Sequence, residues 1–338
     1  MFTHLNKIYH EFPRLFWTVV GIRFVDGIGG TLLFPFFALY ITQKFHVGMT
    51  QAGILLGMFS LFGLIGSMAG GALTDKFGRK QLIMFGLVFS AISTLTFGFV
   101  NNINVMYPLA VLVGSISSMA QPAHEAMIAD ILPENKRQEG FGILRVVGNL
   151  SWIIGPTIGG FVANIDFFYL FVIDSVISCF IAAIVYRTIP ETKPEPHAHA
   201  QSESFLQTVV GYRQPLRDSA FMAFIVANIL MLSVYQQMYG TLSVYLRDNH
   251  HIDPQGYGFL MTTSAITVVL FQFWVSRLIK KRPPFLMMAF GTVFLCDWFC
   301  ALWSVYDVYP VRAQHCHHHH RRDDRCPHQP IIGRELRT

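Results

Sequence analysis

Long apolar blocks separated by short polar connections make up most of the 338-residue chain. Nine blocks are near or above the roughly 20 residues that a helix needs to cross the hydrocarbon core of a membrane. Because a helix satisfies its own backbone hydrogen bonds in lipid, each block predicts a transmembrane helix. The blocks lie at residues 15–40, 50–73, 81–100, 105–131, 140–163, 166–187, 218–246, 255–279 and 285–305.

One connection, residues 189–216, is long and polar, carries four prolines and follows the sixth block. Such a composition is typical of a linker. Six spans, a linker and further spans are the plan of a transporter with two six-helix halves. We therefore predict an all-α polytopic membrane protein with a 6+6 plan of which only about nine spans are present. Its parts are a first half at 1–188, the linker, a partial second half at 217–305 and an aberrant His/Arg-rich tail at 306–338.

The number of charged residues supports a membrane protein, and their distribution predicts how the chain is oriented in the membrane. Only 13% of the residues are charged, against roughly 25% in soluble domains. Two basic residues, Lys44 and Arg247, fall on one side of the predicted membrane. Fifteen fall on the other: Lys7, Arg14, Lys76, Arg79, Lys80, Lys136, Arg137, Arg187, Lys193, Arg213, Arg217, Arg277, Lys280, Lys281 and Arg282. Since cytoplasmic loops carry the basic excess, we predict a multi-pass plasma-membrane protein with a cytoplasmic N-terminus.

The connection between the second and third blocks has a defined pattern of small and charged residues. In it, Gly78 permits a tight turn, and a small residue at Gly71 permits close helix approach. The pattern resembles the loop motif of the major facilitator superfamily, G-x-L-x-D-[RK]-x-G-R-[RK], at every defined position. The resemblance implies a conformational latch between two halves; the alternative is an ordinary basic loop. The residues concerned are Gly71, Leu73, Asp75, Lys76, Gly78, Arg79 and Lys80.

Two further segments are similar to superfamily motifs. Asp130 and Arg137, after the fourth block, have a spacing that implies a charge network around the loop; a solvated helix end is the alternative. The fifth block resembles the superfamily's antiporter motif, G-x-x-x-G-P-x-x-G-G, with Ser in place of the first Gly. That resemblance implies export rather than import, whereas ordinary small-residue packing is the other interpretation. Its residues are Ser151, Gly155, Pro156, Gly159 and Gly160.

Ionisable residues inside apolar blocks are costly unless they face a cavity or a partner. Asp26 lies midway along the first block, one turn after Arg23. With Gly29 and Pro35 it is similar to a setting found in export-type members, which implies that it couples protons. The alternative is a structural pair between Arg23 and Asp26.

Six other residues inside the predicted spans are candidates for a gate or for the lining of a substrate cavity. Glu125 and Arg145 can pair across adjacent helices as an inner gate, or extend separately to the interface. Asp174 can line a central cavity or bond to backbone. The aromatic and amide groups of the seventh block suit an amphipathic or cationic organic substrate, or bond between helices; they are Tyr235, Gln236 and Tyr239.

The tail beyond residue 308 differs sharply from the rest, with six His or Cys residues at 315–320 and many arginines. A metal site is one interpretation, but these arginines fall on the outer side, against the charge rule. If the codons of the tail are read in a shifted frame, they can encode apolar residues in place of its charged and His residues. We therefore expect a frameshift near residues 296–310 and a truncated second half.

The sequence favours a secondary transporter, with proton-coupled efflux of small organic compounds by alternating access. Import of a sugar or another metabolite, and a non-functional truncated fragment, are the alternatives. No nucleophile–base pattern indicates an enzyme, and we expect no cofactor or metal. The expected partners are substrate, protons and the lipid bilayer, but not nucleic acid, and the protein is expected to be a monomer.

Overall fold

The structure is a computed structural model that describes residues 9–193, 217–279 and 282–308. It forms two compact units, Met1–Gln272 and Phe273–Thr338. Most of the predicted linker and nearly all of the His/Arg-rich tail lie outside the described residues. The expected frameshift and the metal interpretation of the tail therefore fall outside them as well.

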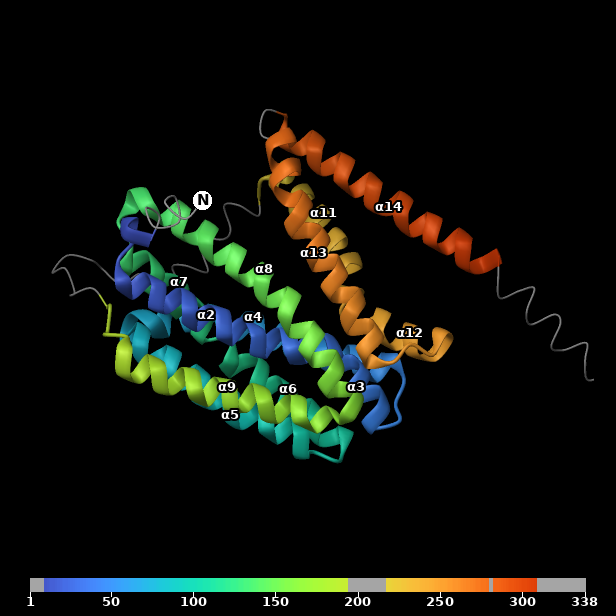
Figure 1. Ribbon diagram of the computed structural model, residues 1–338, viewed down its shortest axis with the longest axis horizontal. Coiled ribbons are helices and arrows are strands. Elements are labelled where there is room, and N and C mark those ends of the chain that lie inside the picture. The colour runs from blue at the N-terminus through green and yellow to red at the C-terminus, as the bar shows by residue number, and fades with distance from the viewer. Residues whose placement is uncertain (1–8, 194–216, 280–281, 309–338) are drawn as a thin grey trace, which may run out of the picture. The chain divides into compact units, whose positions relative to one another are not determined.

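Helices account for all the regular secondary structure of the described residues, which confirms the all-α prediction. The first half of the larger unit is a bundle of long helices (Figure 1). Its elements are α2 (Arg14–Leu33), η1 (Phe34–Phe36), α3 (Phe37–Lys44), α4 (Met49–Phe77), α5 (Arg79–Phe99), α6 (Ile103–Ser117), α7 (Ala120–Ile131), α8 (Glu134–Ile165) and α9 (Phe167–Thr188).

The later elements begin after the linker. They are α11 (Ser219–Gln236), α12 (Thr241–His250), α13 (Pro254–Ile279) and α14 (Pro284–Val308). The larger unit holds α11, α12 and α13 up to Gln272, and the smaller unit holds the end of α13 together with α14.

Seven helical segments of the described chain are long and apolar enough to cross a membrane. They coincide with the first seven predicted blocks and are 14–44, 49–77, 79–99, 103–131, 134–165, 167–188 and 219–250. The eighth and ninth predicted blocks are also helical, as α13 and α14.

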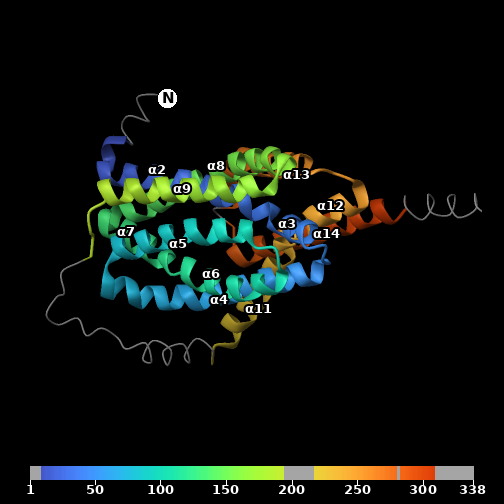
Figure 2. The ribbon, with the colours of Figure 1, turned by 90° about the horizontal axis from the view of Figure 1, so that it is seen from below.

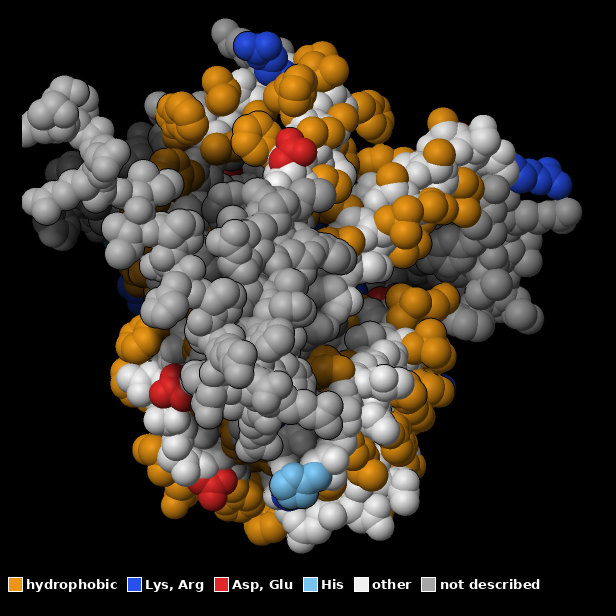
Figure 3. Space-filling view, turned by 90° about the vertical axis from the view of Figure 1, so that its right-hand side faces the viewer, with side chains coloured by type: hydrophobic (Ala, Val, Ile, Leu, Met, Phe, Trp, Pro, Cys, Tyr) orange, Lys and Arg blue, Asp and Glu red, His pale blue; other side chains and the backbone are white. Residues whose placement is uncertain are grey.

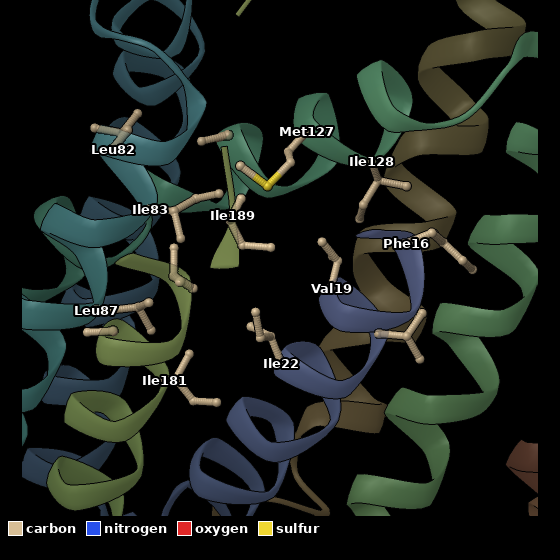
Figure 4. Close-up of a cluster of buried hydrophobic side chains, with 14 of the residues drawn as sticks. Phe16, Val19, Ile22, Leu82, Ile83, Leu87, Met127, Ile128, Ile181 and Ile189 are labelled. Carbon is tan, nitrogen blue, oxygen red and sulfur yellow. The ribbon is translucent and has the colours of Figure 1, made fainter. Parts of the chain in front are cut away.

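The apolar residues of these helices serve two different environments. One set packs inside the bundle, where side chains from α2, α5, α7 and α9 meet around Phe16, Ile83 and Ile181 (Figure 4). Another set faces outward: Leu64, Ile92 and Phe180 are all more than half exposed. On the face shown in Figure 3, hydrophobic side chains cover most of the coloured surface. A helix that is apolar on all sides suits a lipid environment.

Two local features of the chain set the ends of the helices. Pro35 lies in a short 3-10 turn, η1, which interrupts the first span between α2 and α3. Gly78 adopts a φ of +100°, which L side chains rarely tolerate, and separates α4 from α5. We call the end of the bundle that carries Gly78 the Gly78 end, and the end that carries Thr42, in α3, the Thr42 end.

Candidate functional site: a charged turn and an aromatic cavity

The Gly78 turn places Arg79 inside the bundle, because α5 begins immediately after the turn. Arg79 is only 8% exposed. Its Nε donates to the Asp130 carboxylate at 2.9 Å, and its Nη1 lies 3.3 Å from the Asp75 carboxylate. The loop of the second connection and the end of α7 are thereby joined by one guanidinium group.

Glu191, just after α9, completes this charged turn. Its carboxylate accepts hydrogen bonds from the backbone N–H groups of Arg79 at 2.8 Å and Lys80 at 3.1 Å. These are among the N–H groups that lack a partner at the start of a helix. A Cβ at Gly78 would come within 2.6 Å of the same carboxylate, which would have to shift, while the φ of +100° itself favours glycine. The carboxylate acts as a cap for α5.

Other residues of the loop take subsidiary positions. Lys80 donates through Nζ to the Tyr186 carbonyl at 2.9 Å, and the exposed Lys76 accepts, through its carbonyl, from Lys193. Leu73 packs on the buried core. The close approach expected at Gly71 occurs one residue earlier: Gly71 faces open space.

Gly70 carries the close approach instead, because a Cβ there would overlap the backbone of Met119. The polar contacts described for this loop are with the first half and with the beginning of the linker, at Glu191 and Lys193.

Arg137 does not contact Asp130 within the described structure. Its Nε donates to the carbonyl of Ala129 at 3.0 Å, and its Nη1 lies 3.9 Å from the Glu134 carboxylate. Of the two residues expected to join the charge network, Asp130 contacts Arg79 directly, whereas Arg137 binds the carbonyl end of α7.

The antiporter-like segment of α8 packs tightly against α2. Ser151 is buried and donates to the Phe24 carbonyl at 3.0 Å, while the Thr31 hydroxyl donates to the Ser151 carbonyl at 3.0 Å. Side chains at Gly155 and Gly159 would overlap Thr31 and the carbonyl of Leu32. The small residues therefore permit a backbone-to-backbone contact between α2 and α8.

The next small residues of the same helix meet α13. A Cβ at Gly160 would lie 2.9 Å from the Pro254 carbonyl oxygen and 3.2 Å from Gly258 Cα. A short hydrogen bond between the hydroxyls of Thr157 and Thr262 joins the same two helices. The motif thus connects the first half to α13.

The ionisable residues inside the described spans do not form the pair that was considered as an alternative for Arg23 and Asp26. Arg23 and Asp26, both partly buried, form no ion pair within 4 Å in the described structure. Asp174 is buried, and a Cβ on Gly29 would lie 2.7 Å from its carboxylate. Its carboxylate faces Thr94, a residue of α5. Asp174 therefore lies between α5 and α2, near the level of Asp26.

The expected pair of Glu125 and Arg145 is not formed in the described structure. Both residues are exposed, and Glu125 accepts from Gln121 at 2.9 Å on its own helix. Exposure favours the interfacial interpretation over the gate.

A cavity of about 360 Å³ lies between α8, α11 and α13. Rings from different helices meet at it: Trp152 and Tyr239 have centroids 4.8 Å apart, and Tyr235 packs edge-on against Tyr239 at 5.8 Å. Gln236 also lines it, so all three residues predicted from the seventh block reach one cavity. Its lining is Asn149, Trp152, Tyr235, Gln236, Met238, Tyr239, Met261, Ser264, Ala265 and Val268.

Phe34 links this cavity to two others. Its ring lies 6.1 Å from that of Tyr239 and 6.5 Å from that of Trp152. It also lines a cavity of about 480 Å³ between α4 and α11, and one of about 190 Å³ within the first half. The smaller cavity reaches Thr94, which the Asp174 carboxylate faces.

The sequence interpretation missed Glu191, Phe34, Trp152 and Thr94. Glu191 follows Pro190 at the end of the sixth span, and an acid between Arg187 and Lys193 was the available signal. Phe34 precedes Pro35, which predicts a break in the helix. Nothing in the sequence distinguishes Trp152 or Thr94 from the other aromatic and hydroxyl residues of the spans.

Comparisons with known proteins agree with this architecture. The family model described as Major Facilitator Superfamily matches residues 19–312, and the chain belongs to this superfamily. Membership of this superfamily agrees with the multiple membrane spans predicted from the sequence.

Two curated relatives are named for transport. A "Na(+), Li(+), K(+)/H(+) antiporter" of Planococcus maritimus is 27% identical over 281 residues, which are 75% of this chain and 65% of that protein. "Multidrug resistance protein 2" of Bacillus subtilis (strain 168) is 25% identical over 301 residues, 86% of this chain and 74% of that protein. The chain thus spans about two thirds to three quarters of the length of these relatives.

One solved structure shows the same fold. It is a bacterial homologue of the human lysosomal transporter Spinster, in an inward-facing and unoccupied conformation, with a TM-score of 0.62 and 16% identity. The match covers 80% of this chain and 63% of that one.

Proposed function

We propose that the chain exports small organic molecules across the plasma membrane in exchange for protons, by alternating access of two halves to a central cavity. The observation that carries the proposal is the aromatic cavity between α8, α11 and α13, with the clustered rings of Trp152, Tyr235 and Tyr239. Pockets of mainly apolar and aromatic lining with a few polar groups are typical of sites for organic ligands.

The chemistry of the lining favours an organic ligand over an inorganic cation. Among the described residues, no Asp or Glu lines this cavity or the two that adjoin Phe34. Hard cations such as Ca²⁺ and Mg²⁺ are bound by several oxygen ligands, usually including carboxylates. Aromatic faces, in contrast, attract organic cations, and Asn149 and Gln236 can donate or accept hydrogen bonds.

Protons would enter through the first half. Asp26 is partly buried on α2, and Asp174 lies near its level on α9. Carboxyl groups inside a membrane are costly and mark proton relays in many transporters. We propose Asp26 as the principal coupling residue.

Structural roles follow for the other motifs. The Gly71–Lys80 loop and Asp130 would latch the cytoplasmic side, and Gly155 to Gly160 would transmit movement between α2, α8 and α13. We propose that the Gly78 end and the N-terminus face the cytoplasm, which the basic excess on that side supports. We propose that the chain acts as a monomer in the lipid bilayer.

A vesicle experiment tests both direction and coupling. Everted membrane vesicles that contain the chain, energised to an acidic interior, should accumulate the aromatic dye ethidium, and a protonophore should abolish the accumulation. Asp26→Asn should abolish it too, whereas Glu125→Gln should preserve it, because Glu125 bonds only within its own helix in the described structure. Dye movement outward with protons would indicate import and overturn the proposal.

A further inference from the structure

Two basic residues, Lys44 and Arg247, stand on the side of the predicted membrane that is otherwise without Lys or Arg up to the ninth block. Such residues run against the usual charge bias of membrane proteins. Both lie at the Thr42 end, Lys44 at the last position of α3 and Arg247 in the last turn of α12. Neither side chain extends freely into solvent, since each is bound to a specific oxygen atom.

Arg247 reaches from the second half to the first. Its Nη1 donates to Thr42 Oγ1 at 3.0 Å, between residues 205 positions apart in the sequence. The Thr42 hydroxyl uses its own hydrogen toward the carbonyls of Ala38 or Leu39, which leaves its oxygen as an acceptor. Asp248, at 2.6 Å from Arg247 Nε, holds the guanidinium in place. Arg247 itself is only 24% exposed in its side chain, so the bond is partly shielded from water.

The two halves already touch around this bond. Figures 1 and 2 show α12 beside α3, and Val244 packs against Ala38 and Leu39. This cluster has three buried side chains at its centre. A larger cluster also joins the halves, because Leu246, Tyr257 and Met261 pack with Leu32, Phe36, Ala163 and Leu170. The bond from Arg247 adds a polar contact to these apolar ones.

The aromatic cavity opens from this contact. The backbones of α8 and of α13 up to Gln272 approach most closely at Gly160 and Gly258, and toward the Gly78 end the ribbons lie farther apart (Figure 1). A side-chain hydrogen bond from Asn149 to Gln272, at 3.1 Å, still joins the two helices there. The halves are therefore packed backbone to backbone at the Thr42 end and joined through side chains along the cavity.

Lys44 provides the contrast. Its Nζ donates to the Gly98 carbonyl at 2.7 Å and lies 5.2 Å from the centre of the Tyr40 ring. These partners belong to α5 and α3, which are both in the first half. Lys44 therefore supports the fold of one half, whereas Arg247 joins the two.

We propose that the hydrogen bond from Arg247 to Thr42 is a reversible latch that closes the Thr42 end and must break when the cavity opens to that side. The proposal rests on alternating access, as in the proposed function. A single charged bond suits the role because both groups can return to water when it breaks. This role accounts for a basic residue on that side of the membrane. Arg247 stabilises the closed state and does not set the orientation of the helices in the membrane.

A distance measurement tests the latch without any transport. The five native cysteines are first replaced by serine, because two of them, Cys179 and Cys296, are exposed and would also react. Spin labels on Gln51→Cys and Asn249→Cys, both exposed, then report the separation of the halves in the purified chain by pulsed electron paramagnetic resonance. Arg247→Gln should raise the ratio of the long-distance to the short-distance population by about fivefold or more, since a bond to a charged group is lost. Thr42→Val, which keeps the shape but removes the acceptor, should have the same effect.

Matched variants separate the latch from general damage. Combining Arg247→Gln with Thr42→Val should add nothing further, Thr42→Ser should behave as the parent, and Lys44→Gln should leave the ratio unchanged. If Arg247→Gln aggregates, the Val and Ser variants at Thr42 decide the question. An unchanged ratio in Thr42→Val, or strictly additive effects, would overturn the latch. Because no substrate or proton gradient is used, these results do not depend on whether the chain exports organic molecules.

Discussion

The guanidinium of Arg79 lies 2.9 Å from the carboxylate of Asp130, and this contact joins the start of α5 to the end of α7. The two residues come from different connections of the chain, 51 positions apart. Arg79 is buried, so the pair is protected from water on one side, whereas the Asp130 side chain is 21% exposed. The charged turn is thus a structural element of the first half before any movement of the second.

Removal of the Arg79 charge should weaken the first half. Arg79→Gln is expected to lower the free energy of unfolding by about 2 kcal/mol, less than the ~3–5 kcal/mol of fully buried pairs because Asp130 is partly hydrated. Unfolding in mixed micelles measures it. Arg137→Gln is the control, with a loss below about 1 kcal/mol, since its side chain is 42% exposed. Equal losses would contradict the assigned geometry.

Glu191 should stabilise the first turn of α5. Glu191→Ala removes the acceptor for two backbone N–H groups of that turn, and the expected cost is about 1–2 kcal/mol. Hydrogen exchange of the amides in residues 79–83 should accelerate. Glu134→Ala, at a side chain that is 91% exposed, is the matched control and should leave the exchange unchanged. Unaltered protection in Glu191→Ala would show that the cap is dispensable.

The sequence predicted those features that depend on residues close together in the chain. Apolar length predicted the first seven spans, and the pattern around Gly78 located the turn that contains Asp75 and Arg79. Tyr235, Gln236 and Tyr239 were chosen as polar residues of one span, and they do reach one cavity. Function at these sites stays a prediction.

Long-range geometry was not available from the sequence. The partner of Arg247 is 205 residues away, and Glu191 caps a helix that begins 112 residues earlier. Glu125 and Arg145 lie on adjacent predicted spans, as an inner gate requires, but both are exposed and they form no pair with each other in the described structure. Helix rotation is set by tertiary packing, which neither hydropathy nor charge bias encodes.

Two glycines of α8 should respond very differently to the same substitution. Gly159→Val should abolish stable folding or cost more than about 2 kcal/mol, because the new side chain would overlap the Leu32 carbonyl. Gly148→Val, where nothing lies within 4 Å, should be tolerated. Thermal denaturation in detergent compares the two. Similar melting temperatures for both variants would contradict the close packing of α2 on α8.

The aromatic cavity should bind flat aromatic cations through Trp152. Trp152→Leu is expected to weaken equilibrium binding of ethidium by about tenfold, since an aromatic face near a cation contributes about 0.5–2 kcal/mol. Fluorescence polarisation of the dye with the purified chain measures the affinity. Trp17→Leu, which alters a tryptophan packed against Phe12 and Phe16, should leave binding unchanged. Equal loss in both variants would place the dye elsewhere.

Proton exchange is the central claim, and proton flux in liposomes tests it most directly. The purified chain is reconstituted with a pH-sensitive dye inside the vesicles, and ethidium is added outside without an imposed gradient. The account predicts that dye entry drives protons out, so the interior becomes more alkaline, and that Asp26→Asn abolishes the change while ethidium binding persists. Acidification of the interior, or no proton movement despite dye uptake by the parent chain, would contradict it.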